Sequence, residues 1–402
     1  MHSEIQMGQN QLLSLSEEYL FSIDVVKHIS LVYGDRTENI IKALKTPGSR
    51  YCIRVNTLKT DPNHLTRRLC DKGLRAECHP VISEAVFLPV EGPLDLPEMP
   101  KKIGADKYAA ESVLQGAHLY APGVTNCHGI KRGDLVLITD RYGQPAGAGI
   151  ARMSETEILR YRKGLAVELT HPRYRIPCLR ETEEFQKGLI YPQSFPAIVA
   201  SHVLDPQPGE TIVDMCAAPG GKTGHIAQLM HGKGLLIAID RNQEKIADLS
   251  ETVTRLGFQN VKLICQDARY LDINFPDLKA DRVIIDPPCS AIGVRPKLFD
   301  HTKEAEIRAL SEYQRQFIRV AAKIVKPNGI VVYSTCTITT NENEENLRYA
   351  YEDCGLEPED TSFQYGSRGL EWVFGGARYA QRFDPDVHDS PGYCIARFRK
   401  TC

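Results

Sequence analysis

The sequence predicts an α/β protein, in which a doubly wound parallel sheet accompanies a small, mostly β barrel and an N-terminal α+β segment. From residue 211 onward, short apolar runs alternate with helical patterns, as in the strand–helix–strand units of a parallel sheet. Between 101 and 180, Gly and Pro recur among short apolar runs, as in a small barrel with tight turns. At 402 residues the chain also exceeds one ordinary hydrophobic core. We expect domains over 1–100, 101–182 and 185–402.

The parallel sheet is expected to contain five strands, at 211–215, 235–239, 261–265, 282–286 and 330–334. A helix is expected between the second and third strands, because apolar residues recur at spacings of three and four from Ile246 to Leu256 and Gly257 follows. A longer helix before the fifth strand is expected to end at Pro327-Asn328-Gly329. Because ligands bind at the carboxyl ends of such strands, the chemistry should follow these runs.

The region ahead of the sheet has a different character. The first hundred residues combine a helical start with an extended Arg-Val-Asn-Thr stretch at 54–57, and 89–93 resembles a linker. Residues 101–180 hold thirteen Lys or Arg against seven Asp or Glu, a local charge of +6. The total is −2, so the remaining chain carries −8. A basic segment of this kind favours a polyanionic partner.

Composition excludes several other classes of protein. With 42% hydrophobic and 25% charged residues, the chain is typical of a globular protein. It contains no run of eighteen uncharged apolar residues and its start is polar, so neither a membrane span nor a secretory signal is expected. The twelve cysteines are spread singly without a Cys-x-x-Cys pair, which predicts reduced thiols and no cysteine-based metal site. We expect a cytoplasmic protein and a monomer.

A nucleoside cofactor is predicted at the first three strand ends. The first strand leads into DMCAAPGGKT (214–223), whose glycine pair would let a ligand approach the backbone. Asp240 ends the second strand, where an acid accepts ribose hydroxyls, and Asp267 follows the third, where it could accept from an adenine amino group. A phosphate-binding loop is the rival interpretation, but its first glycine position is Cys216. The order favours S-adenosyl-L-methionine over a nucleoside triphosphate, and a methyltransferase over an ATPase.

Cysteines follow the fourth and fifth strands, in Asp286-Pro-Pro-Cys289 and Ser334-Thr-Cys336. Two thiols at one rim of a cofactor sheet suit methylation of a pyrimidine at C5, because that carbon becomes nucleophilic only after a thiolate attacks C6. Asp286 is placed to support charge development at N3 of the ring. The pattern alone leaves open which thiol attacks.

Three motifs, DMCAAPGGKT, DPPCSAIG and STCTITTNENE, together with the upstream RVNT, resemble the NSUN family of RNA cytosine-5 methyltransferases. LQGAHLYAPGV and IKRGDLV are similar to a PUA domain, an RNA-binding module. The resemblance implies a class I methyltransferase (Rossmann-like) catalytic domain behind a PUA barrel. A PUA domain ahead of the catalytic domain is typical of the branch that methylates a cytosine in the acceptor stem of transfer RNA, near the CCA end. The implied partner is therefore the acceptor end of tRNA.

The resemblance also assigns residues. It makes Cys336 the nucleophile and Cys289 the thiol that assists product release, with Asp286 and Lys222 beside the target base. The implied cofactor contacts are Cys216, Ala217, Ala218, Pro219, Gly220, Gly221, Lys222, Asp240, Lys245, Asp267 and Asp286. Tyr120, Lys131 and Arg132 are candidate RNA contacts. Two alternatives stay open: a non-catalytic RNA-binding protein that keeps the cofactor fold as a scaffold, and a cytosine-5 methyltransferase that acts on ribosomal or messenger RNA.

Overall fold

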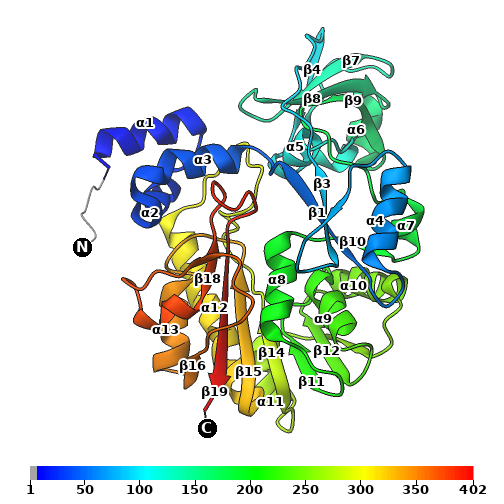
Figure 1. Ribbon diagram of the computed structural model, residues 1–402. Coiled ribbons are helices and arrows are strands. Elements are labelled where there is room, and N and C mark those ends of the chain that lie inside the picture. The colour runs from blue at the N-terminus through cyan, green and yellow to red at the C-terminus, as the bar shows by residue number, and fades with distance from the viewer. Residues whose placement is uncertain (1–6, 402) are drawn as a thin grey trace.

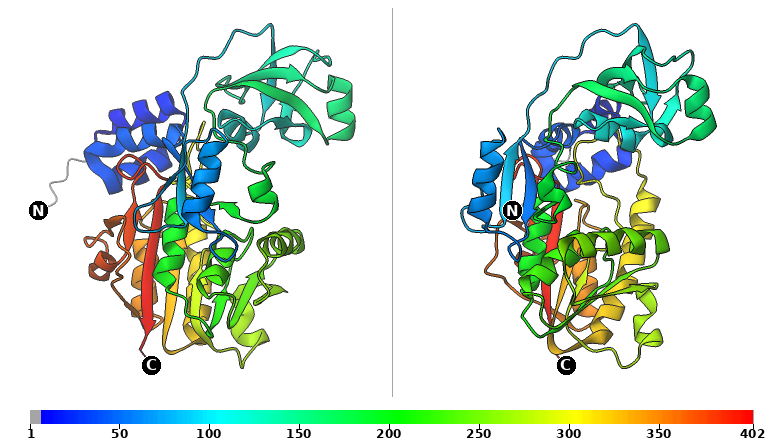
Figure 2. Two further views of the ribbon diagram at one scale, coloured as in Figure 1. Left: turned by 45° about the vertical axis from the view of Figure 1, so that its right-hand side comes forward. Right: turned by 90° about the vertical axis from the view of Figure 1, so that its right-hand side faces the viewer.

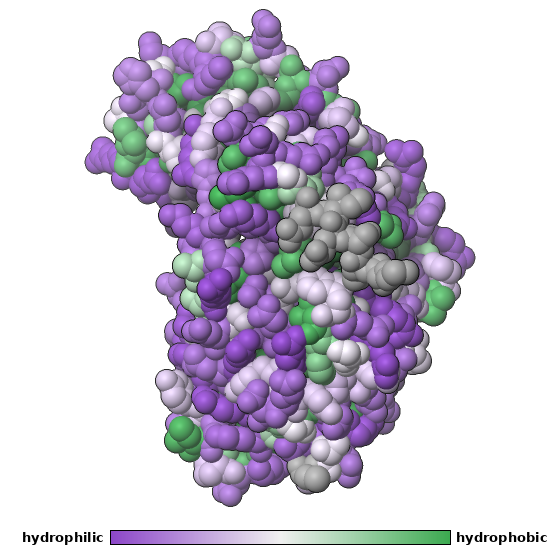
Figure 3. Space-filling model, turned by 90° about the vertical axis from the view of Figure 1, so that its left-hand side faces the viewer, coloured by the Kyte–Doolittle hydropathy of each residue, from purple (hydrophilic) through white to green (hydrophobic). Residues whose placement is uncertain are grey.

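The computed structural model describes residues 7–401. Figures 1 and 2 show a large lobe built on a long sheet, a smaller barrel lobe above it, and an N-terminal segment that lies against both. On the face shown in Figure 3 the surface is largely hydrophilic, and a notch sets the upper barrel lobe apart from the larger one. In the described part of the chain, no helix combines the length and the apolar character needed to cross a membrane.

The central sheet of the large lobe is mixed rather than purely parallel. Its strand order is β13-β12-β11-β14-β15-β19-β18-β17, and β16 pairs with β19. The strands are β11 (Thr211–Asp214), β12 (Leu235–Asp240), β13 (Val261–Cys265), β14 (Ala280–Ile285), β15 (Val325–Thr335), β16 (Leu356–Pro358), β17 (Ser367–Arg368), β18 (Gln381–Phe383) and β19 (Tyr393–Lys400). The first five in this order are parallel, as predicted, whereas β19 and β18 add antiparallel neighbours that the apolar runs did not indicate.

Helices cover both faces of this sheet. One face packs against α8 (Phe195–Leu204), α9 (Gly221–Leu229) and α10 (Gln243–Leu256), and the other against α11 (Leu271–Asn274), α12 (Glu304–Ile324) and α13 (Glu344–Glu352). Successive residues of β14 pack into the cores on opposite faces of the sheet. Ile284 lies in the core beneath α8, α9 and α10, and Val283 and Ile285 lie in the core beneath α11, α12 and α13. This two-sided burial explains why the strands read as continuous apolar runs.

The two helices predicted from periodicity are present. In α10 the Asn242 side chain accepts from the Lys245 N–H, and Gly257 closes the helix in the left-handed region at φ 83°. The end of α12 differs from the prediction: it stops at Ile324, and Pro327-Asn328-Gly329 falls inside the irregular start of β15. Val325 already pairs with Ala280 of β14 there, so sheet pairing ends the helix before the turn residues are reached.

The barrel is inserted into the N-terminal sheet. That sheet has the order β10-β1-β3-β2 and combines β1 (Arg50–Val55), β2 (Glu77–Cys78) and β3 (Ala85–Pro89) with β10 (Ile190–Pro192) from beyond the barrel. The helices that accompany this sheet in the N-terminal domain and beside β10 are α1 (Gln9–Tyr19), α2 (Ile23–Tyr33), α3 (Thr37–Lys45), α4 (Pro62–Asp71) and α7 (Glu183–Gln186). Buried residues of α1–α3 share one core with Ile292, Ile307 and Ile338 of the large lobe.

The barrel lobe is a six-stranded sheet of order β5-β9-β8-β7-β4-β6, and its core also takes in Leu298 and Phe299 of the large lobe. It contains β4 (Lys101–Ala105), α5 (Lys107–Leu114), β5 (Leu119–Tyr120), β6 (Val124–Asn126), β7 (Leu135–Thr139), β8 (Pro145–Ala151), α6 (Glu155–Tyr161) and β9 (Leu165–Pro172). Gly149 permits the close approach of β9, because a Cβ atom there would lie 2.1 Å from the Glu168 carbonyl oxygen. The glycines that punctuated this segment in the sequence therefore serve strand packing as well as turns.

Candidate active site

The loop between β11 and α9 forms the floor of the site. Gly220 adopts φ +105°, and a Cβ atom there would lie 2.8 Å from Leu249 Cδ1 of α10, so only glycine fits the close packing. Thr223 Oγ1 donates to Asp214 Oδ2 at 2.7 Å, which ties the first turn of α9 back to the end of β11. The buried Arg54 donates from Nη1 to the Gly221 carbonyl at 2.6 Å. The loop is thus held from both the sheet and the N-terminal domain.

Carboxylates surround Cys216 in this loop. Burial raises the pKa of its thiol well above the ordinary value, and the charges of Asp214, Asp286, Asp240 and Asp267 raise it further. Four acids from the ends of neighbouring strands therefore create a negative potential at one point. Such a potential favours a cationic ligand, and a sulfonium compound is one.

The two acids assigned to the nucleoside have different surroundings. Asp240 Oδ1 accepts the Asn242 backbone N–H at 3.1 Å. Asp267 is paired with Arg269, whose Nη2 lies 2.6 Å from Oδ2, and this hydrogen bond lowers the Asp267 pKa. Asp267 accepts four hydrogen bonds in all, each from the backbone or side chain of Arg269, so Arg269 fixes the orientation of this carboxylate. Lys245 lies exposed in the first turn of α10.

Asp286 accepts hydrogen bonds from three side chains at the end of the site nearest the two cysteines. Its Oδ2 accepts from Lys222 Nζ at 2.5 Å, and its Oδ1 accepts from Ser334 Oγ at 2.8 Å and from Tyr393 OH at 3.0 Å. Burial disfavours the ammonium form of Lys222, but the charges and hydrogen bonds of Asp286 and Tyr393 together outweigh burial and raise the Lys222 pKa. Lys222 therefore stays protonated next to an oriented carboxylate.

The two predicted cysteines are brought into contact. Cys289 Sγ and Cys336 Sγ lie 3.2 Å apart. The hydrogen bond from Cys289, with the charges of Lys222 and Lys297, lowers the pKa of the Cys336 thiol against the opposing effects of burial and the charge of Asp286. The same bond, with burial and the charge of Glu342, raises the pKa of Cys289. The environment therefore favours a Cys336 thiolate that accepts a hydrogen bond from a Cys289 thiol.

A buried carboxylate fixes the loop that carries Cys289. Glu342 accepts from the Ser290 backbone N–H at 2.8 Å, from Ser290 Oγ at 2.6 Å and from Gln314 Nε2 at 3.0 Å. Ser290 Oγ also lies 2.7 Å from Thr337 Oγ1, next to Cys336. One network thus sets the separation of the two sulfurs.

Three family models match parts of the chain. Residues 201–399 match "16S rRNA methyltransferase RsmB/F", residues 101–172 match "PUA domain", and residues 25–95 match "Methyltr_RsmF/B-like, ferredoxin-like domain". A tRNA (cytosine(72)-C(5))-methyltransferase of Pyrococcus horikoshii is 42% identical over 387 residues, which cover 94% of this chain and 97% of that protein. The Homo sapiens tRNA (cytosine(72)-C(5))-methyltransferase NSUN6 is 32% identical over 398 residues, 88% of this chain and 84% of that protein.

A solved structure agrees with these sequence matches. The crystal structure of NSun6 from P. horikoshii with SFG superposes with a TM-score of 0.86 at 42% identity, covering 96% of this chain and 99% of that chain. Similarity at this level over nearly the whole length decides the family. The chain belongs to the NSUN family of RNA cytosine-5 methyltransferases.

As an NSUN enzyme the chain is an S-adenosyl-L-methionine-dependent methyltransferase, and the site fits that cofactor. The carboxylates around Cys216 suit a sulfonium cation, although Lys222 and Arg269 partly offset the charges of Asp286 and Asp267. The glycine loop before α9 leaves the backbone accessible. Asp240 and Asp267 stand at the ends of β12 and β13, in the order expected for ribose and base.

Two residues of this NSUN site were missed by sequence reasoning. Ser334 stands two residues before Cys336 at the end of β15, and its position beside Asp286 on the neighbouring strand could have been inferred from strand order. Tyr393 belongs to β19, which pairs antiparallel with β15. The apolar run at 393–396 was the signal for that strand, but nothing in it indicated where the strand inserts.

The predicted RNA contacts lie on the PUA lobe, in two separate regions. Tyr120 ends β5 and is 56% exposed, while Lys131 and Arg132 occupy the loop before β7. Arg132 Nη2 contacts Glu157 Oε1 of α6 at 2.6 Å, and Arg162 at the end of α6 donates to the Pro122 carbonyl at 2.8 Å. Helix α6 therefore links the two predicted contact regions.

Proposed function

We propose that this chain methylates C5 of a cytosine in the acceptor stem of tRNA, near the CCA end, through a covalent bond between Cys336 and C6 of the base. The observation that carries the proposal is the contact of two thiols, 3.2 Å apart, beside the Lys222–Asp286 pair. A purely RNA-binding protein has no use for two polarised thiols at a cofactor rim. The relatives named for cytosine 72 support the acceptor stem as the target.

Each side chain of the site has its own role in the reaction. The Cys336 thiolate forms a bond to C6, which moves electron density onto the ring and makes C5 nucleophilic. The proton shared by Lys222 and Asp286 neutralises charge that develops at N3, and Tyr393 and Ser334 orient the carboxylate for that task. When bound, S-adenosyl-L-methionine supplies an electrophilic methyl group for C5.

Product release needs a second thiol. Water takes the C5 proton, the electron pair of the C5–H bond re-forms the C5–C6 double bond, and Sγ of Cys336 leaves with the electron pair of its bond to C6. We assign assistance in this step to Cys289, which the structure keeps in contact with Cys336. The PUA lobe presents the acceptor end to the site through Tyr120, Lys131 and Arg132.

The compartment and assembly state follow the same proposal. The eleven cysteines within residues 7–401 are all free thiols, which suits a reducing compartment such as the cytoplasm. We propose a monomer, and sedimentation of the purified chain tests it.

The decisive experiment is methyl transfer from methyl-labelled S-adenosyl-L-methionine to purified tRNA and ribosomal RNA. We expect label in 5-methylcytosine of tRNA, lost when the target cytosine of an acceptor-stem minihelix is replaced by uracil. Label confined to ribosomal RNA would favour the alternative suggested by the description of the RsmB/F model. No label in any RNA, together with measurable cofactor binding, would leave the non-catalytic RNA-binding protein as the better interpretation.

A further inference from the structure

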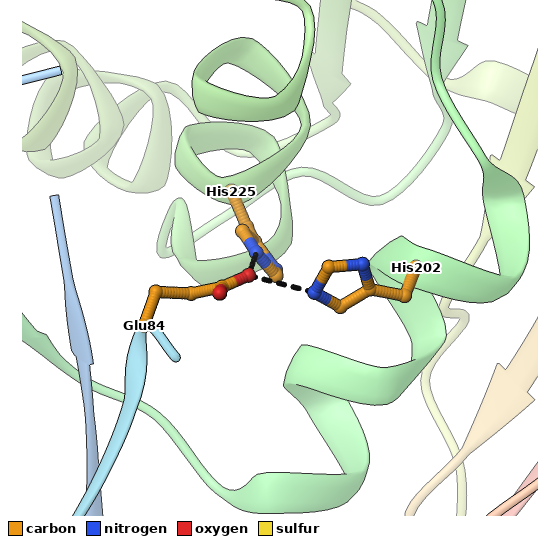
Figure 4. Close-up of side chains that lie close together, drawn as sticks. All are labelled: Glu84, His202 and His225. Atoms are coloured by element: carbon orange, nitrogen blue, oxygen red, sulfur yellow. Dashed lines mark hydrogen bonds and ion pairs between the residues drawn. The ribbon is translucent and has the colours of Figure 1, made fainter. Parts of the chain in front are cut away.

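A second cluster of chemically active side chains lies away from the two cysteines, where the N-terminal domain meets the large lobe. It consists of Glu84, His202 and His225, whose nearest ligand atoms all lie within 4.8 Å of one another. Figure 4 shows both imidazole rings directing a nitrogen at one carboxylate oxygen. Nε2 of His202 lies 2.7 Å and Nε2 of His225 lies 3.2 Å from Glu84 Oε1.

Each side chain comes from a different element and is held in place by packing. Glu84 precedes β3, His202 lies on α8 and His225 on α9. The His202 ring stacks on Phe363 with ring centres 4.8 Å apart, and His225 is fully buried. The three donors therefore converge without being able to swing out into solvent, although the side chain of His202 keeps 14% exposure as a path to water.

The arrangement of the donor atoms suits metal binding, because two imidazole nitrogens approach the same carboxylate oxygen from two different helices. A neutral imidazole and an ionised carboxylate are the forms in which these groups bind metals.

We propose that Glu84, His202 and His225 bind one divalent transition-metal ion, Zn²⁺ by preference. Tetrahedral zinc with ligand bonds of about 2.0–2.2 Å holds its ligand atoms about 3.3 Å apart. The two distances to Glu84 Oε1 are 2.7 and 3.2 Å, so an ion can enter after the donors move apart by a few tenths of an ångström. Two imidazole nitrogens select zinc and its transition-metal neighbours over Mg²⁺ and Ca²⁺, which prefer oxygen ligands.

Two features limit the affinity of the site. The buried Arg54 is close enough that its charge acts on both His225 and Glu84 and opposes a second cation. His225 Nδ1, which must carry the ring proton when Nε2 binds the ion, has no hydrogen-bond partner among residues 7–401. We therefore expect a dissociation constant in the micromolar rather than the nanomolar range.

The ion would act on the catalytic site through a helix. His225 follows Lys222 by one turn of α9, and the same helix begins at Gly221 in the cofactor loop. A metal bridge from Glu84 to His225 would fix the N-terminal domain against that loop. Its function is thus structural support of the catalytic site, with no direct contact with substrate.

The full-length chain, stripped of metal by a chelator, should be titrated with Co²⁺ as a visible probe. We expect the absorption bands of low-symmetry Co²⁺ to saturate at one equivalent, without the near-ultraviolet charge-transfer band of a cobalt thiolate, and to disappear when Zn²⁺ is added. The missing thiolate band distinguishes this site from the Cys289–Cys336 pair. Charge-transfer bands, or no saturable binding by the folded wild-type chain up to millimolar Co²⁺, would overturn the proposal.

Variants locate the ion. Glu84→Gln and His202→Gln should each weaken Co²⁺ binding about tenfold or more, whereas the exposed His64→Gln on α4 should leave it unchanged. Binding that survives in both Glu84→Gln and His202→Gln at wild-type affinity would place the ion elsewhere. Circular dichroism checks folding, and the wild-type titration remains decisive if a variant does not fold.

Discussion

At the level of single residues, the two sulfurs of the catalytic site occupy different electrostatic environments although they touch. For Cys336 the charge of Asp286 opposes those of Lys222 and Lys297, while Cys289 is influenced by the charge of the buried Glu342. The sequence left the choice of nucleophile open and only the family resemblance ranked the two thiols. Cys336 as the attacking thiol stays a prediction.

The two thiols should fail in different ways when removed. Cys336→Ala should abolish turnover and leave cofactor binding intact, because the attacking sulfur is lost and the loop from Cys216 to Lys222 is untouched. Cys289→Ala should trap a covalent protein–RNA adduct, visible as a band that survives denaturing electrophoresis. An adduct formed by the Cys336 variant and not by the Cys289 variant would reverse the roles.

Thiol reactivity tests the pKa difference without RNA. The lowered Cys336 pKa means that raising the pH populates its thiolate earlier than an ordinary thiol, for which the pKa is about 8.5. Alkylation of Cys336, followed peptide by peptide with mass spectrometry, should therefore rise with an inflection below that of the exposed Cys178 in the same sample. In Cys289→Ala the inflection should move to higher pH, because the hydrogen-bond donor is gone. Equal inflections for Cys336 and Cys178 would contradict the polarised pair.

At the level of elements, the cofactor loop depends on how closely it packs on α10. Gly220→Ala should destabilise the chain, because the new Cβ atom would lie 2.8 Å from Leu249 Cδ1 and 3.0 Å from Thr252 Cγ2. We expect a cost of about 1–3 kcal/mol from overpacking, on top of about 1–2 kcal/mol for the left-handed backbone. Denaturant unfolding measures the total, and cofactor affinity should fall with it.

Gly209→Ala is the matched control for that variant. Gly209 also has a left-handed backbone, at φ +93°, but within residues 7–401 no atom beyond its two chain neighbours lies within 4 Å of its added Cβ. Gly209→Ala should therefore lose only the stability that a left-handed backbone costs a residue with a Cβ atom. If the two variants lose equal stability, the packing of Gly220 on α10 contributes nothing.

The elements also show what the sequence could and could not predict. The five parallel strands and α10 were predictable, because burial on both faces gives continuous apolar runs and an amphipathic helix gives a spacing of three and four. Strand β19 was not, because its position between β15 and β18 is set by pairing across a long stretch of chain. For the same reason Tyr393 was missed, whereas Asp286, Cys289 and Cys336, which directly follow predicted strands, were found. The end of α12 was wrong because strand pairing at Val325 took precedence over the turn residues.

On the scale of the whole molecule, RNA binding is expected to rest on the basic PUA lobe. Neutralising Lys131 and Arg132 to Gln should weaken tRNA affinity and flatten its dependence on salt, because each lost phosphate contact lowers the salt slope by about one. Arg132 should contribute the smaller share, since Glu157 already holds it at 2.6 Å. Titrations at several salt concentrations measure the slope.

A charge-matched pair elsewhere controls for net charge. Lys279 and Lys323 lie on the large lobe, and Lys323 is also ion-paired, with Asp272 at 2.6 Å. Their change to Gln should leave the slope as it is. A loss of affinity in the Lys131 and Arg132 variant that does not vary with salt would mean that these residues act through folding.

Domain order was the part of the whole molecule that sequence patterns conveyed least. The basic segment and its barrel were visible from charge and glycine spacing, but β10, which follows the barrel, returns to pair with β1 of the N-terminal sheet. That closure depends on three residues, 190–192, which are too few to give a periodic signal. The barrel is consequently an insertion within one sheet, although along the sequence it looks like the middle of three successive units.

The place of β19 has a consequence for the order in which the protein is made. This strand supplies Tyr393 to Asp286 and lies inside the sheet between β15 and β18, so the hub of the site is unfinished until residues 393–400 have left the ribosome. The core of the PUA lobe, apart from Leu298 and Phe299, is built from residues 103–167, which are synthesised more than two hundred residues earlier. A nascent chain could therefore hold RNA well before it could methylate it, and translation itself separates the two activities in time.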